Sequence, residues 1–281
     1  MSNEQLIADA ILQLKNDTNI FKDYLFPIAM AFFSSLIGAV AGYFVYLRQE
    51  KSANEKRKID LINKWILIAD ELHQNILSIK LNYHGRLSAH PYQRAIFIPV
   101  IIKPEKKYQF DYFELAFITE SKITSQWLSI PFLRTLFANY EVLVSIWSKR
   151  NEFYLKVRDQ LFESQQASGA FVDLSDEEIE KYTDHSDLST LIDLTERALR
   201  LTDDLVIEYY NFLYKFPNVV KNKVDLKLIS NYTKIIETGI ENNKAIHSLL
   251  IDSPKPDYEK ISELSGRSIE ELMARYSSLF K

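Results

Sequence analysis

The chain contains no cysteine, only 6 glycines and 8 prolines, and no excess of positive charge. Without cysteine there are no disulfides, no thiol catalysis, no lipoprotein attachment and no thiolate metal sites, which fits a reducing compartment. An all-β protein of 281 residues would need more turn-forming residues, so the composition favours helices. The formal net charge of −4 argues against direct binding of nucleic acid, because such proteins usually carry a strong positive excess.

The sequence also lacks the short motifs that mark common catalytic and cofactor sites. It has no phosphate-binding P-loop, no dinucleotide-binding glycine motif, no nucleophile elbow and no HExxH zinc motif. The five histidines are scattered, and none pairs with another ligand at helical spacing. We therefore expect no cofactor and no metal, and we find no support for an enzyme, although an enzyme on a helical scaffold stays open as an alternative.

What the sequence does contain is one long apolar run, from Tyr24 to Leu47, with no charged side chain. As a helix it would span about 36 Å, against a hydrocarbon core of about 30 Å. Aromatic rings near both ends suit the membrane interface. This run predicts a transmembrane helix over 24–47. A cleaved signal peptide is disfavoured, because the region before the run is long and net acidic and the run continues past the small residues Ala39-Val40-Ala41.

The basic residues on either side of this run predict its orientation. Only Lys15 and Lys22 precede it, whereas five basic residues follow closely: Arg48, Lys51, Lys56, Arg57 and Lys58. The positive-inside rule then puts the C-terminal side in the cytoplasm and residues 1–23 outside the inner (plasma) membrane. The same basic residues can contact anionic lipid headgroups.

Two further patterns predict contacts with the lipid bilayer and between helices inside it. In the tail, Leu6, Ile7, Ala10, Ile11 and Leu14 form a stripe that predicts a short amphipathic helix on the membrane surface. Within the span, small residues recur every fourth position and share one helix face: Ser34, Gly38 and Gly42. Such a face allows a second helix to pack closely, which predicts a homo-oligomer. Small residues are also common in membrane helices that do not associate, and this alternative stays open.

Residues 48–281 predict an all-α cytoplasmic domain, built as a bundle of long antiparallel helices. From Lys51 to about Tyr83, apolar residues are spaced by three and four, as in a heptad seam: Ile62, Trp65, Ala69, Leu72, Ile76 and Ile79. A parallel coiled coil and one helix of an intramolecular bundle both fit this spacing. The bundle is favoured, because the run is under three heptads and neighbouring isoleucines broaden its apolar surface.

Further helices follow from the same spacing and from capping residues. The predicted elements are a helix within 108–120, a long helix from Pro131 to about Phe162, a helix from Leu188 to Phe216 halted by Pro217, a helix from Val224 to Ile251, and a terminal hairpin. Capping boxes are predicted at Ser175–Glu178 and Ser268–Glu271. A subdivision of the domain is expected near 165–187.

The stretch from His84 to Lys107 departs from the helical pattern, because three prolines interrupt it. Its apolar, β-branched run predicts a short extended segment near 95–104. This stretch is the first candidate for a ligand or partner groove, with His84, His90 and Phe97 as candidate residues. An ordered connector is the favoured alternative.

The region from about residue 20 to 80 carries a loose resemblance. It combines a glycine- and alanine-containing span (LIGAVAGYFVYL), a basic stop (RQEKSANEKRK) and a helix with Glu71-Leu72-His73-Gln74-Asn75. In this order it resembles a broad set of uncharacterised bacterial single-pass membrane proteins, some of which lie in anti-phage loci and act as membrane effectors. The resemblance implies a bacterial origin and an antiviral defence role, and it assigns no functional residue.

Three hypotheses for the function follow. The first is a membrane-tethered module whose cytoplasmic domain binds an unknown protein or small molecule, and it is favoured because a large aromatic-rich domain carries no recognisable chemistry. The second is a membrane-perturbing effector that oligomerises and breaches the bilayer in abortive infection. The third is the enzyme on a helical scaffold.

Overall fold

The computed structural model describes residues 2–16, 19–102, 108–119, 124–168, 175–229 and 232–280. Within these ranges the regular elements are all helices, so the all-helical prediction is confirmed. The chain divides into two compact units, each with its own internal contacts. The first unit comprises Met1–Arg57 and Leu226–Asn231, and the second comprises Lys58–Asp225 and Tyr232–Lys281.

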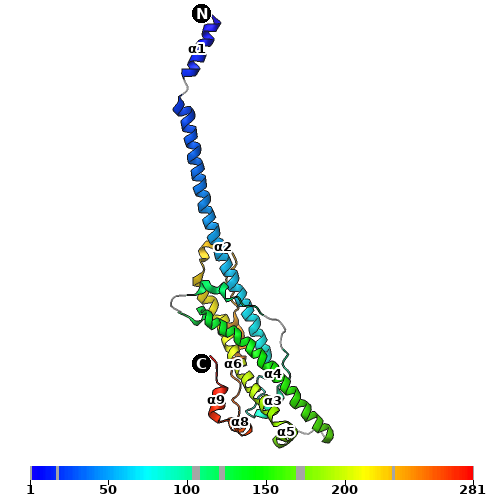
Figure 1. Ribbon diagram of the computed structural model, residues 1–281. Coiled ribbons are helices and arrows are strands. Elements are labelled where there is room, and N and C mark those ends of the chain that lie inside the picture. Colours follow the sequence, from blue (N-terminus) through cyan, green and yellow to red (C-terminus); the bar gives the residue numbers. More distant parts are fainter. Residues whose placement is uncertain are drawn as a thin grey trace. The chain divides into compact units, whose positions relative to one another are not determined.

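The first unit holds the N-terminal helices. Helix α1 spans Asn3–Asn16, and a single wide turn, the π-helix η1 at Phe21–Leu25, leads into α2 at Phe26–Leu81 (Figure 1). Pro27 has no N–H to donate to the carbonyl of Asp23, and the turn before it is widened so that the N–H of Phe26 bonds to Phe21 O. The continuous helix Phe21–Leu81 is the one helix in the described ranges that is long and apolar enough to cross a membrane.

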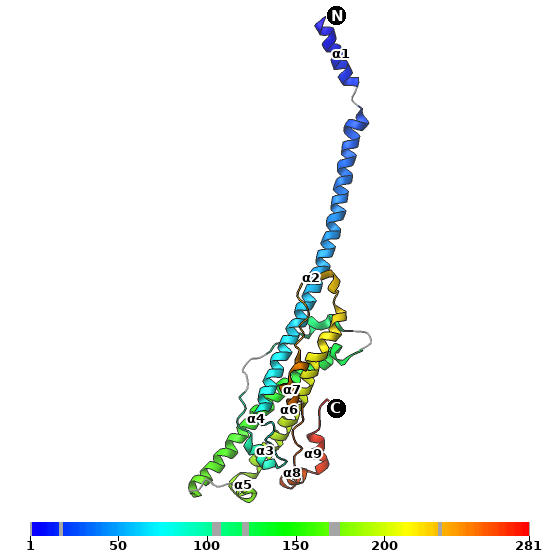
Figure 2. The same cartoon turned by 180° about the vertical axis from the view of Figure 1, so that it is seen from behind.

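The second unit is built on three long helices. They are the part of α2 that follows Arg57, α4 at Ile130–Ser168 and α6 at His185–Val220. These helices lie side by side in both views (Figure 1, Figure 2). Shorter elements cover them: α3 Pro91–Phe97, α5 Asp176–Tyr182, α7 Lys244–Leu249, α8 Tyr258–Ser265, α9 Ile269–Arg275 and the 3-10 turns η2 Tyr112–Ile118, η3 Gln126–Leu128, η4 Lys221–Lys223 and η6 Ile240–Asn242; η5 Leu226–Ile229 belongs to the first unit.

Side-chain contacts give the directions of the long helices. Along α2 and α4 the contacting residue numbers increase together, because Trp65 contacts Phe137, Asn75 donates to the Tyr140 hydroxyl, and Tyr83, just after α2, contacts Trp147. These two helices therefore run parallel. Along α4 and α6 the pairs run in opposite senses, because Phe137 contacts Tyr209 whereas Trp147 Nε1 donates to Thr202. The expected antiparallel packing therefore holds for α4 and α6 but not for α2 and α4, because a long crossover over 82–129 joins α2 to α4.

The apolar faces predicted from residue spacing form the core. All six seam residues of α2 are buried: Ile62, Trp65, Ala69, Leu72, Ile76 and Ile79. The ring of Trp65 lies between Phe110, Tyr112 and Phe137, with centroids 5.1–5.5 Å apart. In the described structure this seam packs inside its own chain, as the bundle interpretation requires, and all three tryptophans are buried.

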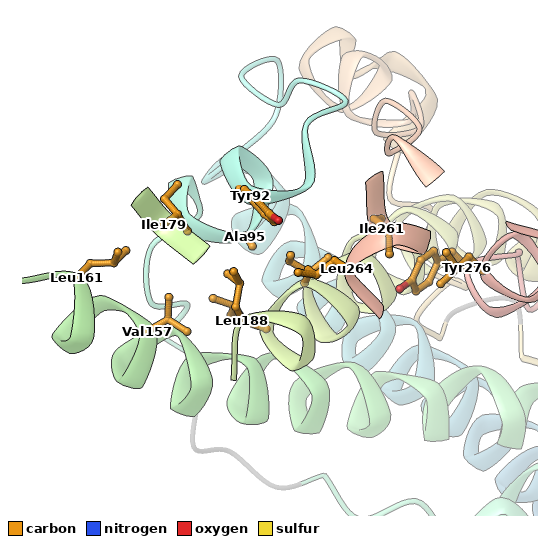
Figure 3. Close-up of a cluster of buried hydrophobic side chains, with 12 residues drawn as sticks. Tyr92, Ala95, Val157, Leu161, Ile179, Leu188, Ile261, Leu264 and Tyr276 are labelled. Atoms are coloured by element: carbon orange, nitrogen blue, oxygen red, sulfur yellow. The ribbon is translucent and has the colours of Figure 1, made fainter. Parts of the chain in front are cut away.

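A second part of the core lies where α3, α5, α8 and α9 cover α4 and α6 (Figure 3). Tyr92 of α3, Leu188 of α6 and Ile261 of α8 meet there with a set of aliphatic side chains. The short helices have too little length to be stable alone, so burial on the long helices holds them in place. The predicted capping box at Ser175 and Glu178 starts α5 with both reciprocal hydrogen bonds present.

Two predicted helices have different ends or different structure. Helix α6 does not stop at Pro217 but continues to Val220, because Phe216, Pro217 and Val220 are buried there and their packing outweighs one missing backbone bond. The helix predicted from Val224 to Ile251 is wrong. In the described part of this stretch, 3-10 turns, extended backbone and the short helix α7 take its place.

The proline-interrupted stretch is also more helical than predicted. Residues 95–97 belong to α3, because His90 caps the first turn and Pro91 occupies a position that needs no N–H donor. Only 98–102 of the predicted extended segment is non-helical in the described structure, and 103–107 lie outside the described residues. The helix expected within 108–120 is reduced to the 3-10 turn η2, and α4 extends to Ser168, with 169–174 outside the described residues.

Candidate functional site

The first candidate site is the uncovered apolar surface of the helix that enters α2. Its most apolar window has a mean hydropathy of 1.9, and none of that window is buried. Large side chains such as Ile28, Phe32 and Ile37 are 66–68% exposed. Soluble monomers rarely expose contiguous apolar patches larger than a few hundred Å², so this surface is a candidate for contact with lipid or with another apolar surface.

The small residues of this helix lie on the same uncovered surface. Ser34, Gly38 and Gly42 are all exposed. A Cβ atom built at Gly38 or Gly42 would meet no atom within 4 Å, so no described part of the chain occupies this face. Packing of a second copy against it stays a prediction.

The basic residues after the apolar run differ in their surroundings. Arg48, Lys51, Lys56 and Arg57 are exposed on α2. Lys58 is half-buried, and its ammonium lies 5.8 Å from the centroid of the Phe117 ring. Lys58 therefore also contributes to packing of the second unit, a role that its place in a basic cluster does not indicate.

The three residues predicted to line a groove are not brought together. His90 is the N-cap of α3, and its Nε2 lies 3.0 Å from Asp176 Oδ2 and 3.1 Å from Lys260 Nζ. Lys260 also pairs with Asp176, so this cluster joins α3, α5 and α8. No hydrogen bond or ring contact in the described structure joins His84 to His90.

The charge state of His90 follows from its neighbours. Its Nδ1 accepts the N–H of Gln93, which requires that nitrogen to be unprotonated. Burial and the positive charge of Lys260 lower the pKa of His90. The neutral ring therefore acts as a helix cap, and Phe97, at the other end of α3, is 40% exposed. These three residues form no common groove in the described structure.

The strongest polar site is one that the residue spacing did not single out. Arg94 of α3 donates to both carboxylate oxygens of Glu196 on α6, at 2.6 and 2.7 Å, and the two side chains are 2% and 3% exposed. Arg94 also donates to the carbonyls of Ser88 and Pro254. Burial raises the pKa of Glu196, and the charge of Arg94 opposes that shift.

A second buried ion pair lies further along the same helix. Lys80 Nζ of α2 is 2.7 Å from Asp203 Oδ1, and these side chains are 1% and 3% exposed. Asp203 also accepts the backbone N–H and the hydroxyl of Ser253, while Lys80 donates to Ile251 O. Glu196 and Asp203 are seven residues apart and share one face of α6. In the sequence, two acids at this spacing on an amphipathic helix were the one sign of these buried pairs. The same pattern is typical of an ordinary solvent-exposed helix face.

Three residues of these pairs, Arg94, Glu196 and Asp203, border a small cavity of about 80 Å³. Its walls are α3, α6 and the segment from Ser253 to Tyr258, with Tyr276 at one side. Arg94 and Arg200 both have carboxylate partners there, and the space suits a few water molecules rather than a metabolite. The arrangement attaches the C-terminal segment to α6, which is a structural task.

Metal chemistry and family relationships give no further assignment. Across the described residues, no group of three or more histidines, aspartates and glutamates could hold a metal ion. No protein-family model, curated protein or solved structure matches the chain. The candidate sites therefore rest on the geometry alone.

Proposed function

We propose that this protein is a membrane-anchored helical interaction module. The apolar part of the helix crosses the bilayer, and the second unit faces the cytoplasm, where it binds a protein or small-molecule partner. The observation that carries this proposal is the apolar window of mean hydropathy 1.9, none of which is buried. A core helix of a soluble protein would instead be covered by its neighbours.

The orientation is supported by the distribution of basic residues. Two lysines precede the apolar run, whereas the five basic residues from Arg48 to Lys58 follow it directly. The hydrocarbon region disfavours translocation of such a cluster, so the C-terminal side stays in the cytoplasm. The binding role is supported by the large packed second unit, which offers a surface and cavities for a partner.

Subcellular partition of the full-length chain tests the anchor. The wild-type protein should stay in the membrane fraction through salt and alkaline washes. The double variant Leu36→Arg/Val40→Arg should leave that fraction, because each charge near the bilayer centre costs about 3 kcal/mol. Leu67→Arg is the matched control, since Leu67 is an exposed leucine of α2 in the second unit and the change should leave partition unaltered. Wild-type protein in the soluble fraction would remove the anchor.

A membrane-perturbing effector is the second candidate function, and one observation favours it. On α1, the side chains of Leu6, Ile7 and Ile11 are 56–60% exposed and form an apolar stripe. Such a helix can lie in the headgroup region and disturb it. Collapse of the membrane potential on expression, abolished by Ile7→Glu, would favour this function over the interaction module.

A further inference from the structure

The second unit contains a larger cavity at the C-terminal end of α6. Its volume is about 290 Å³, which is close to the lower limit of about 300 Å³ for small-molecule sites. One wall is the last part of α6, and the other is the irregular segment that replaces the predicted helix after Val224. The lining residues are Leu213, Tyr214, Pro217, Asn218, Glu237, Thr238, Gly239, Glu241 and Asn242.

The charged side chains that line this cavity in the described structure are both acidic. Glu237 and Glu241 contribute two carboxylates, and the described lining residues include no lysine, arginine or histidine. Lys221 pairs with Glu237 at the rim, without lining the cavity itself. Among the described residues, the Glu241 carboxylate receives a neutral hydrogen bond from the side chain of Asn242 and has no ion-pair partner. The cavity therefore favours a cation over an anion.

Uncharged hydrogen-bond acceptors add to this preference. Pro217 has no N–H, so it cannot bond to the carbonyl of Leu213 four residues earlier in α6. The hydroxyl of Thr238 is buried and has no hydrogen-bond partner in the described structure. The side-chain amides of Asn218 and Asn242 already donate, to Tyr214 O and to Glu241. Together with the two carboxylates, the Thr238 hydroxyl gives the cavity several groups that can accept a hydrogen bond.

An aromatic ring completes the wall. Tyr214 is 45% exposed, and its ring stacks on Tyr210 with centroids 6.5 Å apart. A tyrosine face attracts an ammonium group, and carboxylates beside it add to that attraction. The stack with Tyr210 helps to hold this ring in place.

We propose that this cavity binds a small organic ammonium ion, as the ligand of the interaction module proposed above. The ammonium group faces Glu241 and the Tyr214 ring, and a donor on the ligand reaches the Thr238 hydroxyl. An anionic ligand would meet two carboxylates, and an apolar ligand would leave these acceptors without partners.

The cavity is also connected to the first turns of α2 in the second unit. Asn63 donates to Lys234 O and accepts the N–H of Ile236, and the Tyr232 hydroxyl donates to Asp60. The segment held by these bonds leads directly into Glu237 and Thr238. A cation bound in the cavity would therefore contact both α6 and this segment. The segment is in turn attached to α2 at Asp60 and Asn63, just after the basic residues that end at Lys58.

The test is binding of choline to the full-length protein in a detergent that carries no ammonium group. We expect saturable binding by calorimetry and an increase in the unfolding temperature. The uncharged isostere of choline, dimethylbutanol, has the same shape without the charge and should bind at least about tenfold more weakly, a difference of about 1.4 kcal/mol. Equal binding of the two compounds, or binding of neither, would overturn the proposal.

Single variants locate the site. Glu241→Gln and Tyr214→Leu should each weaken choline binding several-fold, and Thr238→Val should weaken it less. Glu163→Gln is the matched control, since Glu163 is an exposed glutamate of α4 far from the cavity in sequence and lines neither wall. Unchanged affinity in Glu241→Gln and Tyr214→Leu, with both variants folded by circular dichroism, would place choline elsewhere and contradict the assignment.

The source of the ammonium group is distinguished by competition. A short-chain phosphatidylcholine, added as a monomer, should displace choline if a lipid headgroup is the natural ligand and should not if the ligand is a free ion. This binding experiment is made in detergent, so it can fail while the protein still partitions into membranes. Conversely, loss of membrane partition would remove the anchor without affecting choline affinity.

Discussion

Buried charges are the individual residues on which the second unit depends most. Arg94 with Glu196 and Lys80 with Asp203 are each more than nine-tenths buried. Removing such groups from water costs several kcal/mol per ion, and close pairing must offset that cost. Both pairs also bond to backbone groups of the C-terminal segment. These side chains thus couple the stability of α6 to the position of that segment.

Arg94→Met should therefore be strongly destabilising. It leaves the Glu196 carboxylate buried without its cation, a change that typically costs about 3–5 kcal/mol. Urea unfolding of the full-length protein, followed by fluorescence of the buried tryptophans, measures this loss. Arg158→Met is the control, because Arg158 pairs with Asp159 on the surface and such pairs contribute at most about 1 kcal/mol. Similar losses in the two variants would show that the buried pair has no special role.

His73 should make stability depend on pH. It is fully buried on α2, and burial lowers its pKa from 6.5 to about 4. The unfolded chain therefore binds a proton before the folded chain does. The contribution of neutral His73 to the free energy of unfolding is complete above pH 6.5. It falls by about 1.4 kcal/mol per pH unit as the pH decreases toward 4.

The variant His73→Leu should remove that dependence. The free energy of unfolding, measured at intervals between pH 6.5 and 5, should fall less steeply in His73→Leu than in the wild type. His185→Gln, a change of an exposed histidine, should keep the wild-type slope. If wild type and His73→Leu showed the same slope, another group would be responsible for the acid sensitivity.

At the scale of elements, residue spacing predicts the long helices well and the irregular segments poorly. The three- and four-residue spacing of apolar side chains in α2, α4 and α6 reflects burial of one helix face, which is a local property of the sequence. The segments at 98–102 and 232–239 instead depend on bonds from distant residues. Asn151 exchanges two bonds with the backbone of Ile101, and Asn63 does so with the later segment.

The candidate sites also differ in whether the sequence could predict them. The uncharged run and the basic cluster after it are contiguous in sequence and could be recognised directly. The Arg94–Glu196 pair joins residues 102 positions apart, and the cavity proposed to bind an ammonium ion arises from α6 and a segment predicted as a helix. A helix there would have left no irregular wall beside Pro217. Long-range pairing of this kind leaves no periodic signal in one sequence.

Arg150 allows a test of how distant residues place the segment 98–102, because it holds the end of α3. Its guanidinium donates to the carbonyls of Ala95, Ile98 and Pro99, and it lies 4.6 Å from the centroid of the Tyr154 ring. Burial lowers its pKa to about 10, so it remains charged at neutral pH.

Arg150→Met should leave these buried carbonyls without donors and cost about 3 kcal/mol or more. Amide hydrogen exchange provides the local measurement. The amide of Ile101, which donates to Asn151, should lose protection before the amides of α6 do. Lys149→Met, at the exposed neighbouring position, should leave the exchange unchanged. Uniform loss of protection along the chain would mean that Arg150 has no specific role in placing 98–102.

At the scale of the whole molecule, the chain combines an uncovered apolar helix with a packed, charged domain. The apolar helix begins soon after the N-terminus and continues as α2 without interruption to Leu81. One unbroken helix therefore carries both the proposed anchor and a core face of the second unit. In the proposed topology, the second unit lies on the cytoplasmic side, where the positive-inside rule places the basic residues after the apolar run.

The most direct measurement of this claim uses the natural absence of cysteine. Single cysteines are introduced as Gln13→Cys in α1 and Lys244→Cys in α7, both at exposed positions, and intact cells are treated with a membrane-impermeant maleimide. We expect labelling of Gln13→Cys in intact cells and labelling of Lys244→Cys only after the membrane is permeabilised. The same labelling at both positions in intact cells would contradict a membrane-crossing helix.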